Sequence, residues 1–247
     1  MAIDIRPVHA RLERARKHAA EVDAILEAYV SGPPYRIVTR EGSRDDTIVE
    51  RAILVERPPI KAAMAVSDAI HQARASLDNL VNALRVGGPA PGITFPIRAD
   101  KTEWWKLAKD ALEGVPEPIV RTIAAMQPFS SDAFRWAGDE LVALHDLARF
   151  DRHRVPPLHA AVVQPGPVFT DGGDAVVEFR MHDGPDGQWA ETEYVVGRAH
   201  SVRFEVEVRF GADAGAASAG LDVVDWTRRL VDVAYHVARL VLQTPAA

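Results

Sequence analysis

The fold class is decided by the stretch Val202-Arg203-Phe204-Glu205-Val206-Glu207-Val208-Arg209-Phe210, in which apolar and charged side chains alternate. A period of two predicts a β-strand with one buried and one solvated face. The segments 158–164, 174–182 and 189–196 are its predicted companions. The turn between the middle two is predicted at Asp183-Gly184-Pro185-Asp186-Gly187. The sequence therefore predicts a β-meander within a sheet-rich region, 157–210.

The chain before this region has apolar residues at helical spacing. Helices are predicted over 4–32, 58–86, 101–112, 118–126 and 132–155. A β-hairpin over 35–56 is expected to separate the first two helices, because both of its strands are rich in β-branched and aromatic residues. An apolar stripe predicts a closing helix over 219–243.

These elements together predict a single α+β domain over 1–247, with a helix-rich region 1–156 that contains the hairpin. Several long amphipathic helices are expected to pack on an antiparallel sheet. The N-terminal hairpin and the C-terminal meander would build that sheet together, and the C-terminal helix would close the fold.

Composition narrows the class of protein. The chain has 247 residues, 47% of them apolar, which is enough for a full core. Its 29 basic and 35 acidic residues give a net charge of -6, so the composition gives no strong indication of nucleic-acid binding. The absence of cysteine excludes disulfides, thiolate nucleophiles and cysteine-ligated metals.

The expected compartment is the cytoplasm. The first residues contain no apolar signal segment, and no apolar run approaches the length of a membrane span. Arginine is abundant relative to lysine, which is typical of high-GC bacteria and their phages. No membrane partner is expected, and the apolar stripe of the last helix fits a homodimer as well as packing within the chain.

Two polar stripes of opposite order occur on predicted helices, His71-x-x-Arg74-x-x-x-Asp78 and Asp146-x-x-Arg149-x-x-x-His153. Positions i, i+3 and i+7 share one helix face, so each stripe places a base, a cation and a carboxylate together. On a helical wheel both stripes oppose the apolar face. One interpretation is therefore two solvated faces, whose Arg–Asp pairs contribute only about 0.3–0.5 kcal/mol each.

The other interpretation is that the two stripes face each other across a groove. Parallel helices would bring His71 to Asp146 and Asp78 to His153, so that each imidazole gains a carboxylate. Antiparallel helices would bring the two histidines together, which suits a divalent metal. The sequence leaves both arrangements open.

One segment resembles part of a known family. The stretch 67–80, SDAIHQARASLDNL, is similar to "GDALHNLRSALDHL" of a widespread bacterial family of uncharacterised proteins. That family also has "FPI", "QPY" and late "L-x-x-L-x-x-x-DKHR" elements. They correspond to Phe95-Pro96-Ile97, Gln127-Pro128-Phe129 and Leu144-x-x-Leu147-x-x-x-Asp151-Arg152-His153-Arg154, over roughly residues 60–160.

The resemblance implies a set of site residues but no activity. It singles out a candidate catalytic cluster, for which a structural role is about equally expected: His71, Arg74, Asp78, Asp151, His153 and Arg154. The chain departs from the pattern at Asn79, which replaces the second histidine of "LDH", and at Gln72, which replaces the asparagine of "HN". If that second histidine is a ligand or a base in the family, activity in this chain is in doubt.

The interpretation ranked first is a bacterial or phage accessory or binding protein. Asp151, His153 and Arg154 would tie the end of one helix to the polar face of the other. An alternative is a metal-independent phosphodiesterase or a HEPN-like ribonuclease, with histidine as general acid/base and arginine as phosphate clamp. Against it, Arg149 and His153 do not have the usual Arg-x(4-6)-His spacing, because only three residues separate them.

A second alternative is a metal phosphohydrolase of the HD type. His145-Asp146 would be its doublet, His71 a further ligand, and Asp222 or Asp225 would complete the set. No cofactor is otherwise expected, and a divalent metal stays open. A His-Asp dipeptide is common by chance, so this alternative ranks below the ribonuclease.

Overall fold

The computed structural model describes residues 3–32, 34–88, 90, 92–130, 136–150, 155–165, 176–184, 187–195, 204–214 and 217–245. The contacts divide the chain into two compact units. We call them the helical unit, Met1–Asp23, Lys61–Pro157 and Phe210–Ala247, and the sheet unit, Ala24–Ile60 and Leu158–Arg209. The sequence predicts one domain. It contains no visible boundary between the two units, because each unit is assembled from segments far apart in the chain.

The helices begin and end close to their predicted limits. They are α1 (Arg6–Ser31), α2 (Ile60–Leu84), α3 (Lys101–Ala111), α4 (Glu117–Ala125), α5 (Trp136–Phe150) and α6 (Val223–Gln243), with a short 3-10 turn η1 (Ala212–Ala214). Asp100 and Asp222 cap α3 and α6 by accepting backbone N–H bonds of 2.8 and 2.9 Å. Asp132, where the helix over 132–155 is predicted to begin, lies outside the described residues. Among the described helices, none has the length and apolarity of a membrane span.

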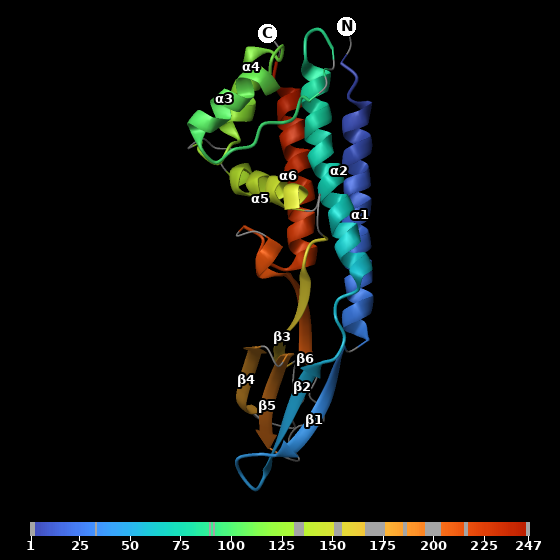
Figure 1. Ribbon diagram of the computed structural model, residues 1–247. Helices are drawn as coiled ribbons and strands as arrows, with labels where there is room; N and C mark the ends of the chain where they lie inside the picture. Colours follow the sequence, from blue (N-terminus) through green and yellow to red (C-terminus); the bar gives the residue numbers. More distant parts are fainter. Residues whose placement is uncertain are drawn as a thin grey trace. The chain divides into compact units, whose positions relative to one another are not determined.

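The core of the helical unit comes from the apolar stripes that the sequence predicts. On α2, the residues of the predicted apolar face are all buried: Val66, Ile70, Ala73, Leu77, Leu80, Val81 and Leu84. The first part of α1 runs alongside α2, and α5 lies across α6 (Figure 1). The ion pairs Arg16–Asp232 and Asp23–Arg228 join α1 to α6. Polar contacts join these helices at their rims, including Arg11 to Gln72 at 2.7 Å.

The sheet unit contains antiparallel strands from both ends of the chain. The hairpin β1 (Tyr35–Glu41) and β2 (Thr47–Leu54) joins β5 (Gly187–Val195) and β4 (Val176–Gly184) in the order β1-β2-β5-β4. This confirms an α+β fold with an antiparallel sheet that combines the hairpin with C-terminal strands, and a C-terminal helix.

The predicted meander is split between two sheets. Strands β3 (Leu158–Pro165) and β6 (Phe204–Phe210) pair with each other in a second, two-stranded sheet. Strand β5 already pairs with β2 at one edge and with β4 at the other. Neither edge of β5 is therefore free to pair with β6. The alternation along β6 is confirmed, since Phe204 and Val208 are buried while Glu205 is exposed.

The turn of the first hairpin is held by a buried carboxylate on β5. Glu193 Oε1 accepts bonds from the Ser43 backbone N–H at 2.5 Å, the Ser43 hydroxyl at 2.6 Å and the Thr47 hydroxyl at 2.6 Å. These bonds, with Ser43 contributing most, lower the pKa of Glu193 to about 2. A Cβ on Gly42 would lie 2.1 Å from the Thr47 hydroxyl oxygen, so only glycine fits beside this network.

Gly138 allows the backbone of α5 to approach the Gln127-Pro128 segment. A Cβ at Gly138 would lie 2.5 Å from Pro128 Cα, a contact with rigid backbone. We expect Gly138→Ala to lower the free energy of unfolding by about 1–3 kcal/mol, because α5 must move away. The measurement is urea denaturation.

Gly32→Ala is the matched control. The nearest atom to a Cβ there is Ala28 O at 3.9 Å, an ordinary contact, so its effect should stay within about 0.5 kcal/mol. Equal unfolding midpoints for the two variants would contradict the close approach of α5.

Candidate functional site

The structure describes half of the candidate cluster. His71, Arg74 and Asp78 lie on α2, and all three side chains are partly buried. Asp151, His153 and Arg154 lie outside the described residues, so the predicted meeting of the two stripes stays a prediction. His145, Asp146 and Arg149 are described and lie on α5.

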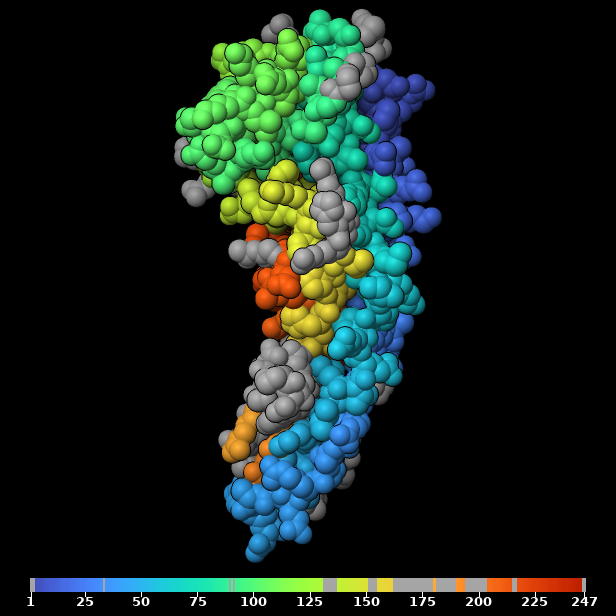
Figure 2. Space-filling model, in the orientation of Figure 1, coloured from blue at the N-terminus to red at the C-terminus, as the bar shows by residue number. Residues whose placement is uncertain are grey.

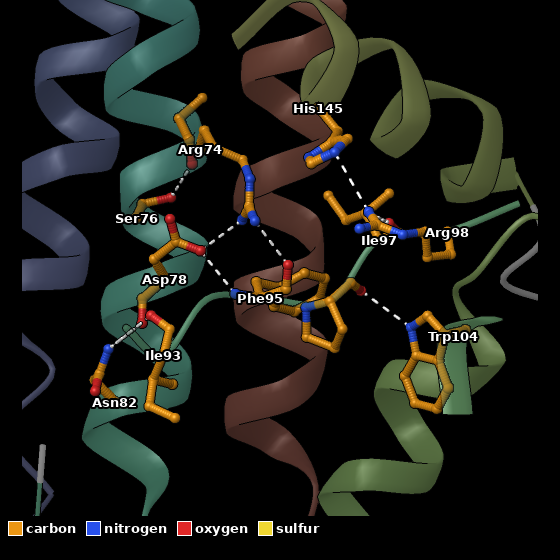
Figure 3. Close-up of polar contacts among 12 residues, drawn as sticks. Arg74, Ser76, Asp78, Asn82, Ile93, Phe95, Ile97, Arg98, Trp104 and His145 are labelled. Carbon is orange, nitrogen blue, oxygen red and sulfur yellow. Dashed lines mark hydrogen bonds and ion pairs between the residues drawn. The ribbon is translucent and has the colours of Figure 1, made fainter. Parts of the chain in front are cut away.

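The stripe on α2 holds the backbone of the loop that follows it. Arg74 donates from Nη1 to Asp78 Oδ1 and from Nη2 to the Phe95 carbonyl, both at 2.7 Å. The Phe95 N–H donates to the same Asp78 oxygen, also at 2.7 Å (Figure 3). We call this arrangement the Phe95 clamp: Arg74, Asp78 and the two backbone polar groups of Phe95.

The clamp provides hydrogen-bond partners for the backbone of a buried residue, Phe95. The Phe95 side chain is fully buried, and its peptide groups must find partners away from water. A charged pair on α2 provides them through charge-assisted bonds, which are stronger than bonds between neutral groups. The clamp thereby fixes the point at which the loop crosses α2.

Asn82 extends the clamp by one more helical turn. Its Nδ2 donates to the Asp78 carbonyl at 3.1 Å and to the Ile93 carbonyl at 3.4 Å. Its Oδ1 accepts from the Ala90 N–H at 3.2 Å. The interpretation of this helix face as plain solvated surface is therefore corrected, because the loop covers it and leaves the Arg74 side chain only 12% exposed.

The QPF element of the resemblance, Gln127-Pro128-Phe129, lies beside the same loop. The Trp104 indole N–H donates to the Pro96 carbonyl at 3.0 Å, and its ring meets Phe129 edge-on with centroids 5.8 Å apart. Buried Gln127 accepts from the Arg98 N–H at 3.4 Å. The FPI and QPF elements and the α2 stripe thus lie together, although the sequence separates them.

The loop also brings Arg98 to His145. The Arg98 guanidinium donates from Nη1 to the Ile97 carbonyl at 2.8 Å, and the same nitrogen lies 3.5 Å from His145 Nε2. Figure 3 shows these two side chains pointing toward each other, one from the loop and one from α5. In this geometry the neutral imidazole accepts at Nε2 and carries its proton on Nδ1.

Burial and the nearby charges favour the neutral form of this imidazole. Burial lowers the pKa of His145 first, the positive charges of Arg74, Arg98 and Arg149 lower it further, and only Asp146 opposes them. The sequence predicts His145 as part of a metal doublet and predicts no role for Arg98. The signal that could have found Arg98 is its position directly after Phe95-Pro96-Ile97.

The metal interpretation gains no support from the arrangement. Within the parts of the chain that the structure describes, no three His, Asp or Glu side chains form a group that could hold a metal ion. All three residues of the HD set, His71, His145 and Asp146, belong to those parts. Asp222, a candidate to complete the set, is used instead as the cap of α6.

Comparisons with known proteins assign nothing to this site. No family model, no curated protein and no solved structure matches the chain. What the site does must therefore follow from its own geometry.

The lowered pKa of His145 makes stability depend on pH. In the unfolded chain histidine has its ordinary pKa of about 6.5. Below that value the unfolded state binds a proton that the folded state resists, so stability is lost as pH falls. We expect the wild type to lose more stability between about pH 7.5 and 5.5 than His145→Gln, measured by urea denaturation.

A second variant checks the cause of the shift. Arg98→Gln removes a positive charge beside the imidazole and should raise the pKa of His145 in an NMR titration of the ring. Equal acid sensitivity of wild type and His145→Gln, together with an unmoved His145 titration in Arg98→Gln, would refute this account.

Proposed function

We propose that this protein is a bacterial or phage accessory protein that binds a ligand and does not turn over a substrate. The observation that carries the proposal is the Phe95 clamp. Arg74 and Asp78, two of the three candidate residues that the structure describes, are engaged in holding a loop. In this proposal, Arg74 and Asp78 fix the loop that forms part of the binding region.

A catalytic role makes demands that this geometry opposes. A general base must keep a free oxygen within reach of the substrate proton, and a phosphate clamp must aim its donors at the substrate. Asp78 Oδ1 already accepts two bonds, and Arg74 already directs Nη1 and Nη2 into the protein. A substrate that displaced these contacts would leave the backbone of buried Phe95 unpaired.

One observation favours a second candidate function, metal-independent phosphodiester cleavage. Neutral His145, with Arg98 at 3.5 Å, has the composition of a general base paired with a phosphate-binding cation. This candidate ranks second because no arginine precedes His145 at the Arg-x(4-6)-His spacing.

The test is the variant Asp78→Ala. Removal of the carboxylate leaves the Phe95 N–H and the Arg74 guanidinium without a shared acceptor, which should cost about 1–3 kcal/mol in the free energy of unfolding. Urea denaturation measures the loss. Asp146→Ala is the control, since this exposed carboxylate lies in the same unit and should matter by less than about 0.5 kcal/mol.

An activity assay completes the test. Wild-type protein incubated with single-stranded RNA and with bis(p-nitrophenyl) phosphate should show no turnover. Turnover that Asp78→Ala abolishes while its stability stays unchanged would overturn the proposal in favour of an enzyme.

A further inference from the structure

Two arginines beside the Phe95 clamp, Arg98 and Arg149, have no acidic partner among the residues that the structure describes. Within the described residues, neither Arg98 nor Arg149 forms an ion pair, whereas Arg74 is neutralised by Asp78 at 2.7 Å. Most exposed arginines elsewhere in the helical unit do meet a carboxylate, for example Arg121 with Glu117 at 3.0 Å. Arg98 instead points at an imidazole.

The fold places these groups around one spot. His145 and Arg149 are four residues apart on α5, so their side chains share one helix face. The loop anchored by the clamp brings Arg98 to within 3.5 Å of His145 Nε2. Arg149 is exposed and the other two side chains are partly exposed. Figure 2 shows residues of α5, in yellow, reaching the surface of the helical unit beside α3 and α4, in green.

The charges that face His145 are predominantly positive. They come from Arg74 on α2, Arg98 on the loop, and Asp146 and Arg149 on α5. Among the residues that the structure describes, three guanidinium groups thus face one carboxylate there, and a bound anion would reduce this excess of positive charge. Arginine forks and imidazolium groups are the usual donors to oxyanions.

We propose that Arg98, His145 and Arg149 bind a phosphate group carried by a small molecule. This inference rests on the proposed function, because it names the ligand class of the same binding region. Donors from a loop and from a helix approach the spot from different directions, which suits the several acceptor oxygens of a phosphate. A small ligand fits better than a long polyanion, because the chain has a net charge of -6.

Binding should be coupled to protonation of His145. An anion beside the ring favours the imidazolium, which then becomes a further donor to the ligand. The neutral imidazole of the free protein would therefore take up a proton as the anion binds. Affinity for an anion of constant charge should increase as pH falls.

The experiment is a titration of the full chain with inorganic phosphate at constant ionic strength, followed by the NMR signals of the His145 ring. Saturable shifts and a raised pKa of His145 are expected. Sulfate, whose charge is constant, serves for the pH dependence and should bind more tightly at about pH 6 than at about pH 7.5. No saturable shift with either anion would overturn the proposal.

Matched variants locate the site. Arg98→Gln should weaken phosphate binding by about tenfold or more, because one charge-assisted bond is lost. Arg121→Gln, an exposed arginine on α4, should leave it unchanged. His145→Gln should abolish the pH dependence of sulfate binding. Circular dichroism confirms folding, and equal affinities for Arg98→Gln and Arg121→Gln would overturn the assignment.

Three ligands distinguish the sources of the phosphate group. A nucleoside monophosphate that binds at least as tightly as inorganic phosphate supports a small phosphorylated ligand. An RNA oligonucleotide that binds much more tightly than both overturns the restriction to small molecules. Cleavage of that RNA, with phosphate binding still dependent on Arg98, would refute the proposed non-enzymatic function while leaving the phosphate site in place.

Discussion

The helical unit depends on one carboxylate oxygen. Asp78 Oδ1 accepts from Arg74 on its own helix and from the N–H of buried Phe95, while Arg74 returns a bond to the Phe95 carbonyl. These bonds satisfy a peptide that could not otherwise leave water, since an unpaired buried backbone group is costly. Because Phe95 is fixed, Pro96 can accept from Trp104, and Arg98 can reach Gln127 and His145.

The same constraint connects structure to function. A charged pair that holds backbone groups has fewer donors and acceptors left for a substrate, and it determines where the next charged side chain lies. Arg98 follows the clamped residues directly and meets His145 on α5, in surroundings where positive charges outnumber negative ones. The clamp therefore favours a binding protein, and the position of Arg98 favours an anionic ligand.

Much of the local structure could be predicted from periodicity. The apolar stripe of α2 and the alternation along β6 reflect the periods of a helix and a strand, which depend only on neighbouring residues. The split of the predicted meander could not be predicted, because strand partners are chosen over long sequence separations. Of the candidate site, Arg74 and Asp78 could be named from their spacing on the helix. Their hydrogen bonds to the backbone of Phe95 could not be predicted, because a helical wheel shows which face is polar but not which segment covers it.

The sequence by itself determined the helices and strands, the α+β class, the absence of cysteine chemistry and the importance of the α2 stripe together with Phe95-Pro96-Ile97. Only the tertiary structure decided that the stripe holds a loop, that β3 pairs with β6, and that Arg98 meets His145. The physical reason is that secondary structure follows from local spacing, whereas the partner of a buried polar group is whichever distant segment the packing brings within hydrogen-bond distance.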